Sequence, residues 1–277
     1  MLSIIIVSYD SDDFLNDCLD SIFKYNDIGD ELEVFVVDNA SSYKTKSIIY
    51  GYKRVVYVKN NNTGFGAGNN IGALRAKNEY LLFLNPDTVL LEPVFSFAVN
   101  QFRANRQLRA FGMLLVDENG RWQETFGFFP EKIKILPEKF YLPLIKLGYT
   151  PSKVFPWGAN LFVRRKDFME AGMFDENIFM CYEEPDLLHR LPKGTVKIFP
   201  KKIMHKAGHS NANLSGRYEV ALRSEKYYFS KYGYSYKRYV VIHMLKLFML
   251  MSIKKVFLID YENERVLLGL YKESMER

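Results

Sequence analysis

The sequence has little cysteine and lacks the motifs of several common protein classes. Cys18 and Cys181 are its two cysteines. Two isolated cysteines supply no disulfide framework, which indicates a reducing compartment. No basic-then-apolar signal pattern precedes the first strand-like run, so we expect a cytoplasmic protein. No group of His and Cys has the spacing of zinc ligands.

Two nucleotide-binding motifs are also missing. The dinucleotide motif G-x-G-x-x-G would have to follow the first strand directly, but residues 8–11 there are Ser-Tyr-Asp-Ser. The glycine-rich run at 64–68 follows the third strand instead. The Walker A motif is absent as well. These absences argue against NAD as a cofactor and against hydrolysed ATP.

Composition and charge are those of a globular protein with one basic region. Hydrophobic residues make up 48% and charged residues 25% of 277 residues, which predicts one large domain with an appendage. The net charge is +6. Residues 226–255 contain Lys and Arg but neither Asp nor Glu. Such a stretch can meet nucleic acid, an anionic membrane or an acidic substrate; its Met and Leu content matches no nucleic-acid-binding motif, so we expect no nucleic acid partner.

The first hundred residues alternate between apolar strands and amphipathic helices. Continuous apolar runs predict buried strands of a parallel sheet, and helical spacing separates them. The alternation predicts an α/β fold with a Rossmann-like, mostly parallel central sheet flanked by helices. The predicted strands are residues 2–8, 32–38, 55–59 and 81–84, and the predicted helices cover residues 14–23, 41–50 and the segment ending near residue 76.

Polar residues follow three of these strands, at positions 8–10, 38–41 and 85–87. The third group, after the strand at 81–84, is the most informative. Residues 81–91 read LLFLNPDTVLL. Pro86 cannot donate to a sheet, so the strand should end before it and leave Asp87 at its carboxyl end. Ligands of open parallel sheets bind at that edge.

Several motifs together resemble glycosyltransferase family 2, and later ones its rhamnosyltransferase-like branch. Members are inverting enzymes of the GT-A fold that use nucleotide-sugar donors. The resemblance spans about residues 2–210. The motifs are SIIIVSY (3–9), VFVVDNASS (34–42), NNNTGFGAGNN (60–70), LFLNPD (82–87), WGANLFVRR (157–165), GMFDENIFMCYEEPDLLHR (172–190) and HKAGHS (205–210).

The resemblance assigns a nucleotide-binding group. Asp38 would hydrogen-bond the imide N–H of uracil or thymine, which suits UDP or dTDP. Without the resemblance, Asp38 and Asn39 are equally consistent with a turn or helix cap, and residues 64–69 with a flexible turn. The nucleotide-binding residues it implies are Ser8, Tyr9, Asp38, Asn39, Gly64, Gly66, Asn69 and Asn85.

The resemblance also implies a metal site for Mg²⁺ or Mn²⁺. Asn85-Pro86-Asp87 occupies the family's D-x-D position, so Asp87 is the one carboxylate there. Hard divalent ions prefer oxygen ligands, which Asp87, the diphosphate and water would supply. His205 resembles a family histidine near the metal or diphosphate, and His209 is a weaker candidate. A structural role is the alternative for each.

The catalytic residues implied lie in Glu183-Glu184-Pro185-Asp186. Inverting transfer needs a carboxylate that takes the acceptor's proton. We predict Glu184 as this general base, with Glu183 second. Arg190 is expected to pair with Asp186 at i, i+4 or to meet the diphosphate. The alternative is that these acids merely begin a helix.

Trp157 and Gly158 are expected to border the donor sugar and the acceptor. Asp186 and Arg190 are also expected to border the acceptor or the donor sugar. A buried core position is the alternative for Trp157. A further strand is predicted over residues 161–163, and we expect Arg164 and Arg165 after it to face solvent or phosphate. Residues 121–156 lack clear periodicity; we expect a mobile loop or short helices that belong to the acceptor pocket, and no role is predicted for the individual residues.

Two parts of the chain are expected: a catalytic domain over residues 1–215 and a helical extension over 216–277. Residues 1–110 would bind the nucleotide-sugar and residues 111–215 the acceptor. The apolar run at 239–253 is shorter than the roughly 20 residues that span a bilayer. It therefore predicts either an interfacial membrane helix or a helix packed on the domain.

The resulting hypothesis is an inverting glycosyltransferase of bacterial cell-surface polysaccharide biosynthesis. It would move rhamnose from dTDP-rhamnose to a saccharide or lipid-linked saccharide, at the inner face of the plasma membrane. The alternatives are the same chemistry with UDP-glucose, UDP-galactose or UDP-galactofuranose, and a non-catalytic nucleotide-sugar-binding scaffold.

Overall fold

A mostly parallel sheet organises the larger of two compact units. The computed structural model describes residues 1–41, 43–131, 138–206, 214–256 and 260–276. Unit 1 comprises Met1–Phe179 and Glu183–Ser210, and unit 2 comprises Met180–Tyr182 and Asn211–Arg277. Each unit is described by itself below.

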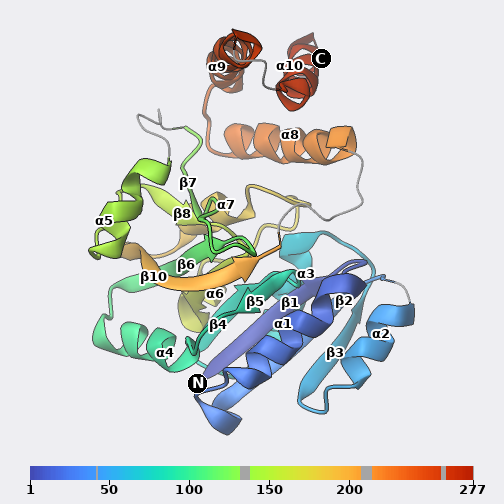
Figure 1. The fold of residues 1–277 in the computed structure, drawn as a ribbon, viewed down its shortest axis with the longest axis vertical. Coiled ribbons are helices and arrows are strands. Elements are labelled where there is room, and N and C mark those ends of the chain that lie inside the picture. Colours follow the sequence, from blue (N-terminus) through green and yellow to red (C-terminus); the bar gives the residue numbers. More distant parts are fainter. Residues whose placement is uncertain (42, 132–137, 207–213, 257–259, 277) are drawn as a thin grey trace. The chain divides into compact units, whose positions relative to one another are not determined.

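The sheet of unit 1 has the strand order β3-β2-β1-β4-β9-β6-β10-β5 (Figure 1). Strands β9 and β5 run antiparallel to their neighbours, and the remaining pairs are parallel. The strands are β1 Leu2–Ser8, β2 Leu32–Asn39, β3 Val55–Asn60, β4 Tyr80–Leu84, β5 Thr88–Leu90, β6 Leu108–Val116, β9 Asn160–Arg164 and β10 Thr195–His205. The four strands predicted in the first hundred residues and the strand predicted over residues 161–163, which is part of β9, are confirmed; β5, β6 and β10 had not been predicted.

Helices cover both faces of this sheet, which is why β1 is buried along its whole length. Ile4 and Ile6 pack with residues of α1 and α4, whereas Ile5 and Val7 pack with residues of α3, α6 and α7. The alternation follows from the period of two along a strand. The helices of unit 1 are α1 Asp12–Lys24, α2 Tyr43–Tyr50, α3 Phe65–Arg75, α4 Phe95–Ala104, α5 Leu142–Lys146, α6 Arg165–Glu170 and α7 Glu183–Arg190, with short 3₁₀ turns η1 Gly29–Glu31 and η2 Glu138–Tyr141.

Where the sequence predicted a mobile loop or short helices, over residues 121–156, the structure has the short helices η2 and α5 and also a small two-stranded sheet that had not been predicted. Strands β7 Phe126–Phe128 and β8 Val154–Pro156 pair antiparallel. Phe126 and Val154 pack with Ile145 of α5 in a separate apolar cluster. Residues 132–137 lie outside the described part of the chain.

Unit 2 is helical, as the sequence predicted beyond residue 216. Its helices are α8 Leu214–Lys231, α9 Tyr236–Val256 and α10 Glu262–Glu276. Aromatic side chains of α8 and α9 pack together; the Phe229 and Tyr239 ring centroids, for example, lie 4.5 Å apart. Among the described residues, none of the helices is long and apolar enough to cross a membrane.

Candidate active site

Segments from distant parts of unit 1 meet at the carboxyl edge of the sheet. Ser8 and Asp38 are register partners at the ends of β1 and β2. Asn85 follows β4 directly, and its amide donates a 3.1 Å hydrogen bond to the carbonyl of Ala159. Because β1, β2 and β4 run parallel, these polar residues lie along one edge of the sheet.

The Asp38 carboxylate is buried and already held by two donors. The Ser41 amide donates to Oδ1 at 2.9 Å, and the Tyr57 hydroxyl donates to Oδ2 at 2.9 Å. Burial and the Asp38 hydrogen bond raise the pKa of Tyr57 to about 12, so this phenol keeps its proton and donates. Each carboxylate oxygen has a second lone pair for a ligand. Tyr9 beside this group is 56% exposed, so its ring face is accessible.

Gly64 and Gly66 of the glycine-rich segment lie closer to residues 174–179 than a residue with a side chain normally would. Gly64 has φ 107° and precedes α3; a Cβ there would lie 2.6 Å from the carbonyl oxygen of Phe179. A Cβ on Gly66 would lie 3.0 Å from Cβ of Phe174 and 3.8 Å from Cβ of Glu183. The Asn39 side-chain amide donates to the carbonyl of Gly64 at 3.1 Å. The glycine-rich segment therefore lies between the end of β2 and the first turn of α7.

Glu183 and Glu184 are both buried, at the first turn of α7. The Gly158 amide donates a 2.5 Å hydrogen bond to Glu184 Oε1. Burial raises the pKa of both carboxyls, and the neighbouring Glu184 charge raises that of Glu183 further. Both are therefore stronger bases than an exposed carboxylate, as a proton acceptor at neutral pH requires.

Asp186 and Arg190 bind each other, one turn apart on α7. The Arg190 Nη2 and Nε donate to Asp186 Oδ2 at 2.7 and 3.0 Å, and Nη1 donates to the carbonyl of Ala171. Asp186 is fully buried. Arg190 was expected either to pair with Asp186 or to meet the diphosphate, and the structure shows the pairing with Asp186.

Asp87 and His205 face each other across β5 and β10. Their flanking residues are paired, with His205 opposite Thr88, and His205 Nε2 lies 3.3 Å from Asp87 Oδ1. Among the described residues no group of three or more His, Cys, Asp or Glu has the arrangement of a metal centre. Asp87 Oδ1 nevertheless makes no hydrogen bond within the protein. One carboxylate and one imidazole suit a divalent ion that takes its remaining ligands from diphosphate and water. His209 lies outside the described residues.

Several of the residues predicted from sequence carry a buried polar atom without a hydrogen-bond partner in the protein. Such groups normally find a partner, so each points to a missing ligand or water. In the part of the chain described, they include Ser8 Oγ, Asn69 Oδ1, Asn85 Oδ1, Asp87 Oδ1 and Glu183 Oε2.

Two further residues at this edge were missed by the sequence reasoning. Trp122 Nε1 and Gln123 Oε1 are also buried without a hydrogen bond. Trp122 bridges to Val116, the last residue of β6. The rarity of Trp was the one available signal, because no period marks this segment.

Trp157, the residue before Gly158, is partly exposed. Its side chain is 38% accessible, and its ring centroid lies 6.0 Å from that of Phe155. A fully buried core position, the alternative for Trp157, is therefore wrong. A partly exposed indole can stack on a sugar ring.

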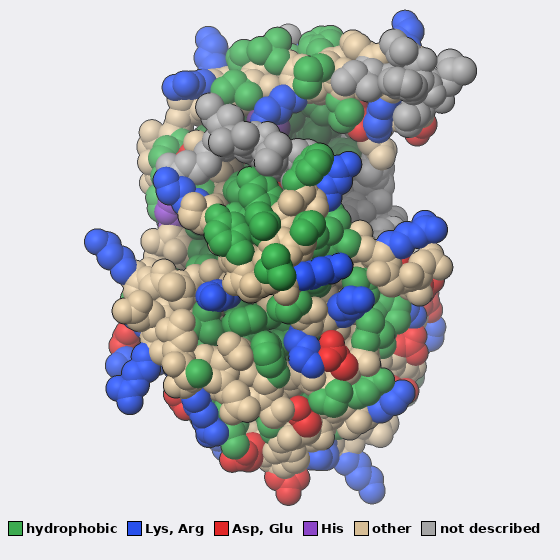
Figure 2. Space-filling model, turned by 60° about the vertical axis from the view of Figure 1, so that its left-hand side comes forward, with side chains coloured by type: hydrophobic (Ala, Val, Ile, Leu, Met, Phe, Trp, Pro, Cys, Tyr) green, Lys and Arg blue, Asp and Glu red, His purple; other side chains and the backbone are tan. Residues whose placement is uncertain are grey.

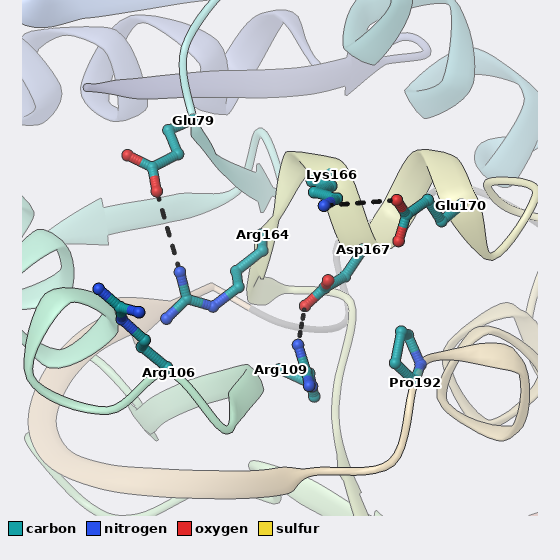
Figure 3. Close-up of a pocket in the computed structure, with 8 residues that line it drawn as sticks. All are labelled: Glu79, Arg106, Arg109, Arg164, Lys166, Asp167, Glu170 and Pro192. Carbon is teal, nitrogen blue, oxygen red and sulfur yellow. Dashed lines mark hydrogen bonds and ion pairs between the residues drawn. The ribbon is translucent and has the colours of Figure 1, made fainter.

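A hollow of about 530 Å³ lies at the opposite, amino edge of the sheet (Figure 3). Arg109 pairs with Asp167 at 3.0 Å there, and Arg164 lies 3.9 Å from Glu79. The expectation that Arg164 faces solvent or phosphate is wrong. Its side chain is 14% exposed and donates to carbonyls at the end of α4, including that of Asn105, which lack partners in the helix.

Residues 3–172 match the family described as glycosyl transferase family 2. The chain belongs to this family. It is similar to the rhamnosyltransferase WbbL of Escherichia coli strain K12, with 26% identity over 217 residues, 72% of this chain and 79% of the relative. It is also 34% identical over 92 residues to a poly(ribitol-phosphate) β-glucosyltransferase of Bacillus spizizenii, covering 31% of this chain and 14% of that one.

Solved structures of glycosyltransferases share the fold. A Pyrobaculum calidifontis mannosyltransferase, in complex with GDP-Man and Mn²⁺, aligns with a TM-score of 0.61 at 17% identity, over 80% of this chain and 62% of that one. Staphylococcus aureus TarS in complex with UDP-GlcNAc aligns with a TM-score of 0.55 at 16% identity, over 79% and 64%. The expected GT-A fold and the assignment as a glycosyltransferase of family 2 are confirmed.

Proposed function

We propose that this glycosyltransferase moves a rhamnosyl group from dTDP-rhamnose to a hydroxyl of a saccharide or lipid-linked saccharide in surface-polysaccharide assembly. The similarity to a rhamnosyltransferase over 72% of the chain supports the donor sugar. The Asp38 carboxylate, which accepts N–H and O–H donors, suits the imide of thymine or uracil.

One observation carries the proposal: the Glu184 carboxylate is buried, oriented by the Gly158 amide at 2.5 Å, and raised in pKa by that burial. In the reaction, Glu184 takes the proton of the acceptor hydroxyl. The hydroxyl oxygen bonds to the anomeric carbon, and the bond from that carbon to the diphosphate oxygen breaks on the opposite face. Configuration inverts, and the proton stays on Glu184 until solvent removes it.

The remaining residues bind and orient the donor. Ser8, Tyr9 and Asp38 would line the base, and the backbone near Gly64 would approach the nucleotide. Asp87 and His205 would hold a Mg²⁺ or Mn²⁺ ion. When bound, such an ion neutralises the charge that develops on the leaving diphosphate.

A donor screen tests the proposal. We expect dTDP-rhamnose to raise the melting temperature more than UDP-glucose, UDP-galactose or UDP-galactofuranose, with a larger shift in Mn²⁺, because a ligand that binds the folded state stabilises it. Preferential stabilisation by a UDP-sugar would reassign the donor and keep the chemistry. No stabilisation by any of the four would contradict the function.

The non-catalytic alternative predicts binding without turnover. For an enzyme, Glu184→Gln should lower kcat about 10²–10⁴-fold while donor affinity stays within a few-fold, since the amide keeps the shape but accepts no proton. Release of dTDP measures turnover, and the exposed Glu170→Gln serves as control. Wild-type protein that binds donor and releases no nucleotide with any acceptor pool would favour the scaffold.

We also propose that α9 rests on an anionic lipid surface, where a lipid-linked acceptor would lie. Helix α9 contains no Asp or Glu, and Val241, Leu245, Phe248 and Met249 are exposed at helical spacing. Figure 2 shows hydrophobic side chains next to Lys and Arg on the C-terminal helices. Basic helices with an apolar stripe bind at such interfaces.

Vesicle binding tests this surface. The full chain should sediment with vesicles that contain phosphatidylglycerol and remain in solution with pure phosphatidylcholine. Replacing Leu245 and Met249 by Ser should weaken the sedimentation, whereas replacing the exposed Leu74 of α3 by Ser should not. Failure of the wild-type chain to sediment with anionic vesicles would rule the membrane contact out.

A further inference from the structure

A three-residue segment of unit 2 is inserted into the sequence of unit 1 just before the acidic helix. Met180–Tyr182 belongs to unit 2, while Phe179 and Glu183 on either side of it belong to unit 1. Helix α7 begins at Glu183, the residue after Tyr182. The segment is therefore bonded directly to the first residue of α7.

The segment has an unusual backbone conformation. Cys181 and Tyr182 have φ of 67° and 71°, consecutive left-handed positions occupied by residues other than glycine. This conformation is unfavourable for a residue other than glycine, so it persists only where its surroundings hold it. Strained non-glycine residues of this kind gather at functional sites.

Helix α8 supplies the contacts that hold the segment. The Ser224 hydroxyl donates to the carbonyl of Met180 at 2.8 Å. The Tyr182 hydroxyl donates to Glu225 Oε2 in a short hydrogen bond, and the Tyr182 and Tyr228 ring centroids lie 5.6 Å apart. Ser224 and Glu225 are both 4% exposed, so water does not compete for these bonds.

Glu225 is the centre of a phenol cluster. The hydroxyls of Tyr239 and Tyr271 also donate to its Oε2, at 3.0 and 3.3 Å. Burial raises the pKa of Tyr182 well above its ordinary value, so its hydroxyl keeps its proton and remains a donor. A buried carboxyl group is costly to leave without hydrogen bonds, and Tyr182 supplies one of the donors to Glu225.

We propose that Glu225 and Tyr182 are positioning residues, through which α8 holds the Met180–Tyr182 segment and so sets the orientation of Glu183 and Glu184. This inference rests on the proposed catalytic role of Glu184. It assigns to the C-terminal unit a part in catalysis that is distinct from membrane contact. Neither residue needs to touch the substrate.

Two hydroxyl deletions provide a matched test. Tyr182→Phe and Tyr271→Phe each remove one donor from the same oxygen of Glu225, but Tyr182 alone belongs to the segment before α7. We expect Tyr182→Phe to lower kcat about 10-fold or more with donor KM unchanged, because misplaced catalytic groups lose rate steeply. Tyr271→Phe should stay within about 2-fold of wild type, as expected for a bond outside that segment.

Two substitutions of Glu225 test whether an acceptor oxygen at this position restores kcat. Glu225→Ala should reproduce the kcat loss of Tyr182→Phe, whereas Glu225→Gln, which keeps an acceptor oxygen for the Tyr182 hydroxyl, should restore most of it. Equal losses in Tyr182→Phe and Tyr271→Phe, or a wild-type kcat in Tyr182→Phe, would overturn the inference.

A readout independent of turnover separates this inference from the proposed function. Amide hydrogen exchange of a peptide covering residues 180–187 should be faster in Tyr182→Phe and Glu225→Ala than in wild type and Tyr271→Phe. If the wild-type enzyme uses none of the donors, the proposed function fails while this exchange pattern still decides whether the segment is held. Unchanged exchange in Tyr182→Phe would reject the positioning role even in an active enzyme.

Discussion

The amide of Gly158 lies 2.5 Å from Oε1 of Glu184, although the two residues are 26 positions apart in the sequence. A Cβ on Gly158 would lie 2.8 Å from that same oxygen and 3.3 Å from the Phe65 ring. The close approach places the end of β8 against the start of α7 and orients the proposed base.

Gly158→Ala should therefore displace the Glu184 carboxylate. Because the added methyl meets the carboxylate oxygen below contact distance, we expect kcat to fall about 10²-fold with smaller effects on donor affinity. Steady-state kinetics measures this. Gly120→Ala is unsuitable as a control because Gly120 has a positive φ, but Gly216 has open space around it, and Gly216→Ala should leave kcat unchanged.

The acid limb of the pH–rate profile should lie above the ordinary carboxyl range. Burial raises the pKa of Glu184, and the general base must be ionised to act, so kcat/KM should fall as the pH drops through a value above 4.5. Rates measured from pH 4 to 8 test this. An acid limb at or below pH 4.5 would remove Glu184 as the base.

Asp87→Asn and His205→Ala should weaken the response to divalent ions. Each removes one of the two protein ligands proposed, so the Mn²⁺ concentration that gives half-maximal donor-dependent stabilisation should rise about 10-fold or more. Melting curves with donor and titrated Mn²⁺ measure this without turnover. Glu92→Gln, an acid paired with Lys201 elsewhere on unit 1, serves as control. An identical Mn²⁺ dependence in all variants would exclude the site.

Asp186→Asn should destabilise unit 1, since it leaves the Arg190 guanidinium without its buried partner. Loss of one member of a buried pair costs about 3–5 kcal/mol, and the 22% exposure of Arg190 favours the lower end. Glu170→Gln breaks a pair at the same i, i+4 spacing that is largely exposed, and should cost less than about 1 kcal/mol. Urea unfolding compares the two variants. Equal costs would show that the Asp186–Arg190 pair is not structurally important.

Glu225 should make stability depend on pH. Burial raises its folded pKa to about 7 from 4.5, so its contribution is full below pH 4.5 and is lost as pH rises through 7. The shift corresponds to about 3 kcal/mol at roughly 1.4 kcal/mol per pKa unit. The free energy of unfolding of wild type minus that of Glu225→Gln should fall by about this amount between pH 4.5 and 7.5. Glu219→Gln, at an exposed position of α8, should show no such trend. A pH-independent difference would mean that Glu225 is not buried as described.

The strands of the first hundred residues up to β4, and their order along the chain, were predictable from local patterns. Continuous apolar runs such as residues 2–8 and 81–84 require cover on both faces, which implies a parallel sheet. The position of Asp87 after Pro86 followed from chain chemistry alone, because proline ends a strand. The helix start at Glu183 was likewise visible in its cluster of acids.

The partners of those residues were decided by tertiary structure. No local pattern relates Gly158 to Glu184, His205 to Asp87, or Tyr182 to Glu225, because each contact joins segments brought together by the sheet or by helix packing. Strand β10 escaped prediction because its burial is irregular along its length. The sequence alone thus determined which residue types stand at strand and helix ends. The fold decided which of them are buried together, and burial is what alters their basicity and orientation.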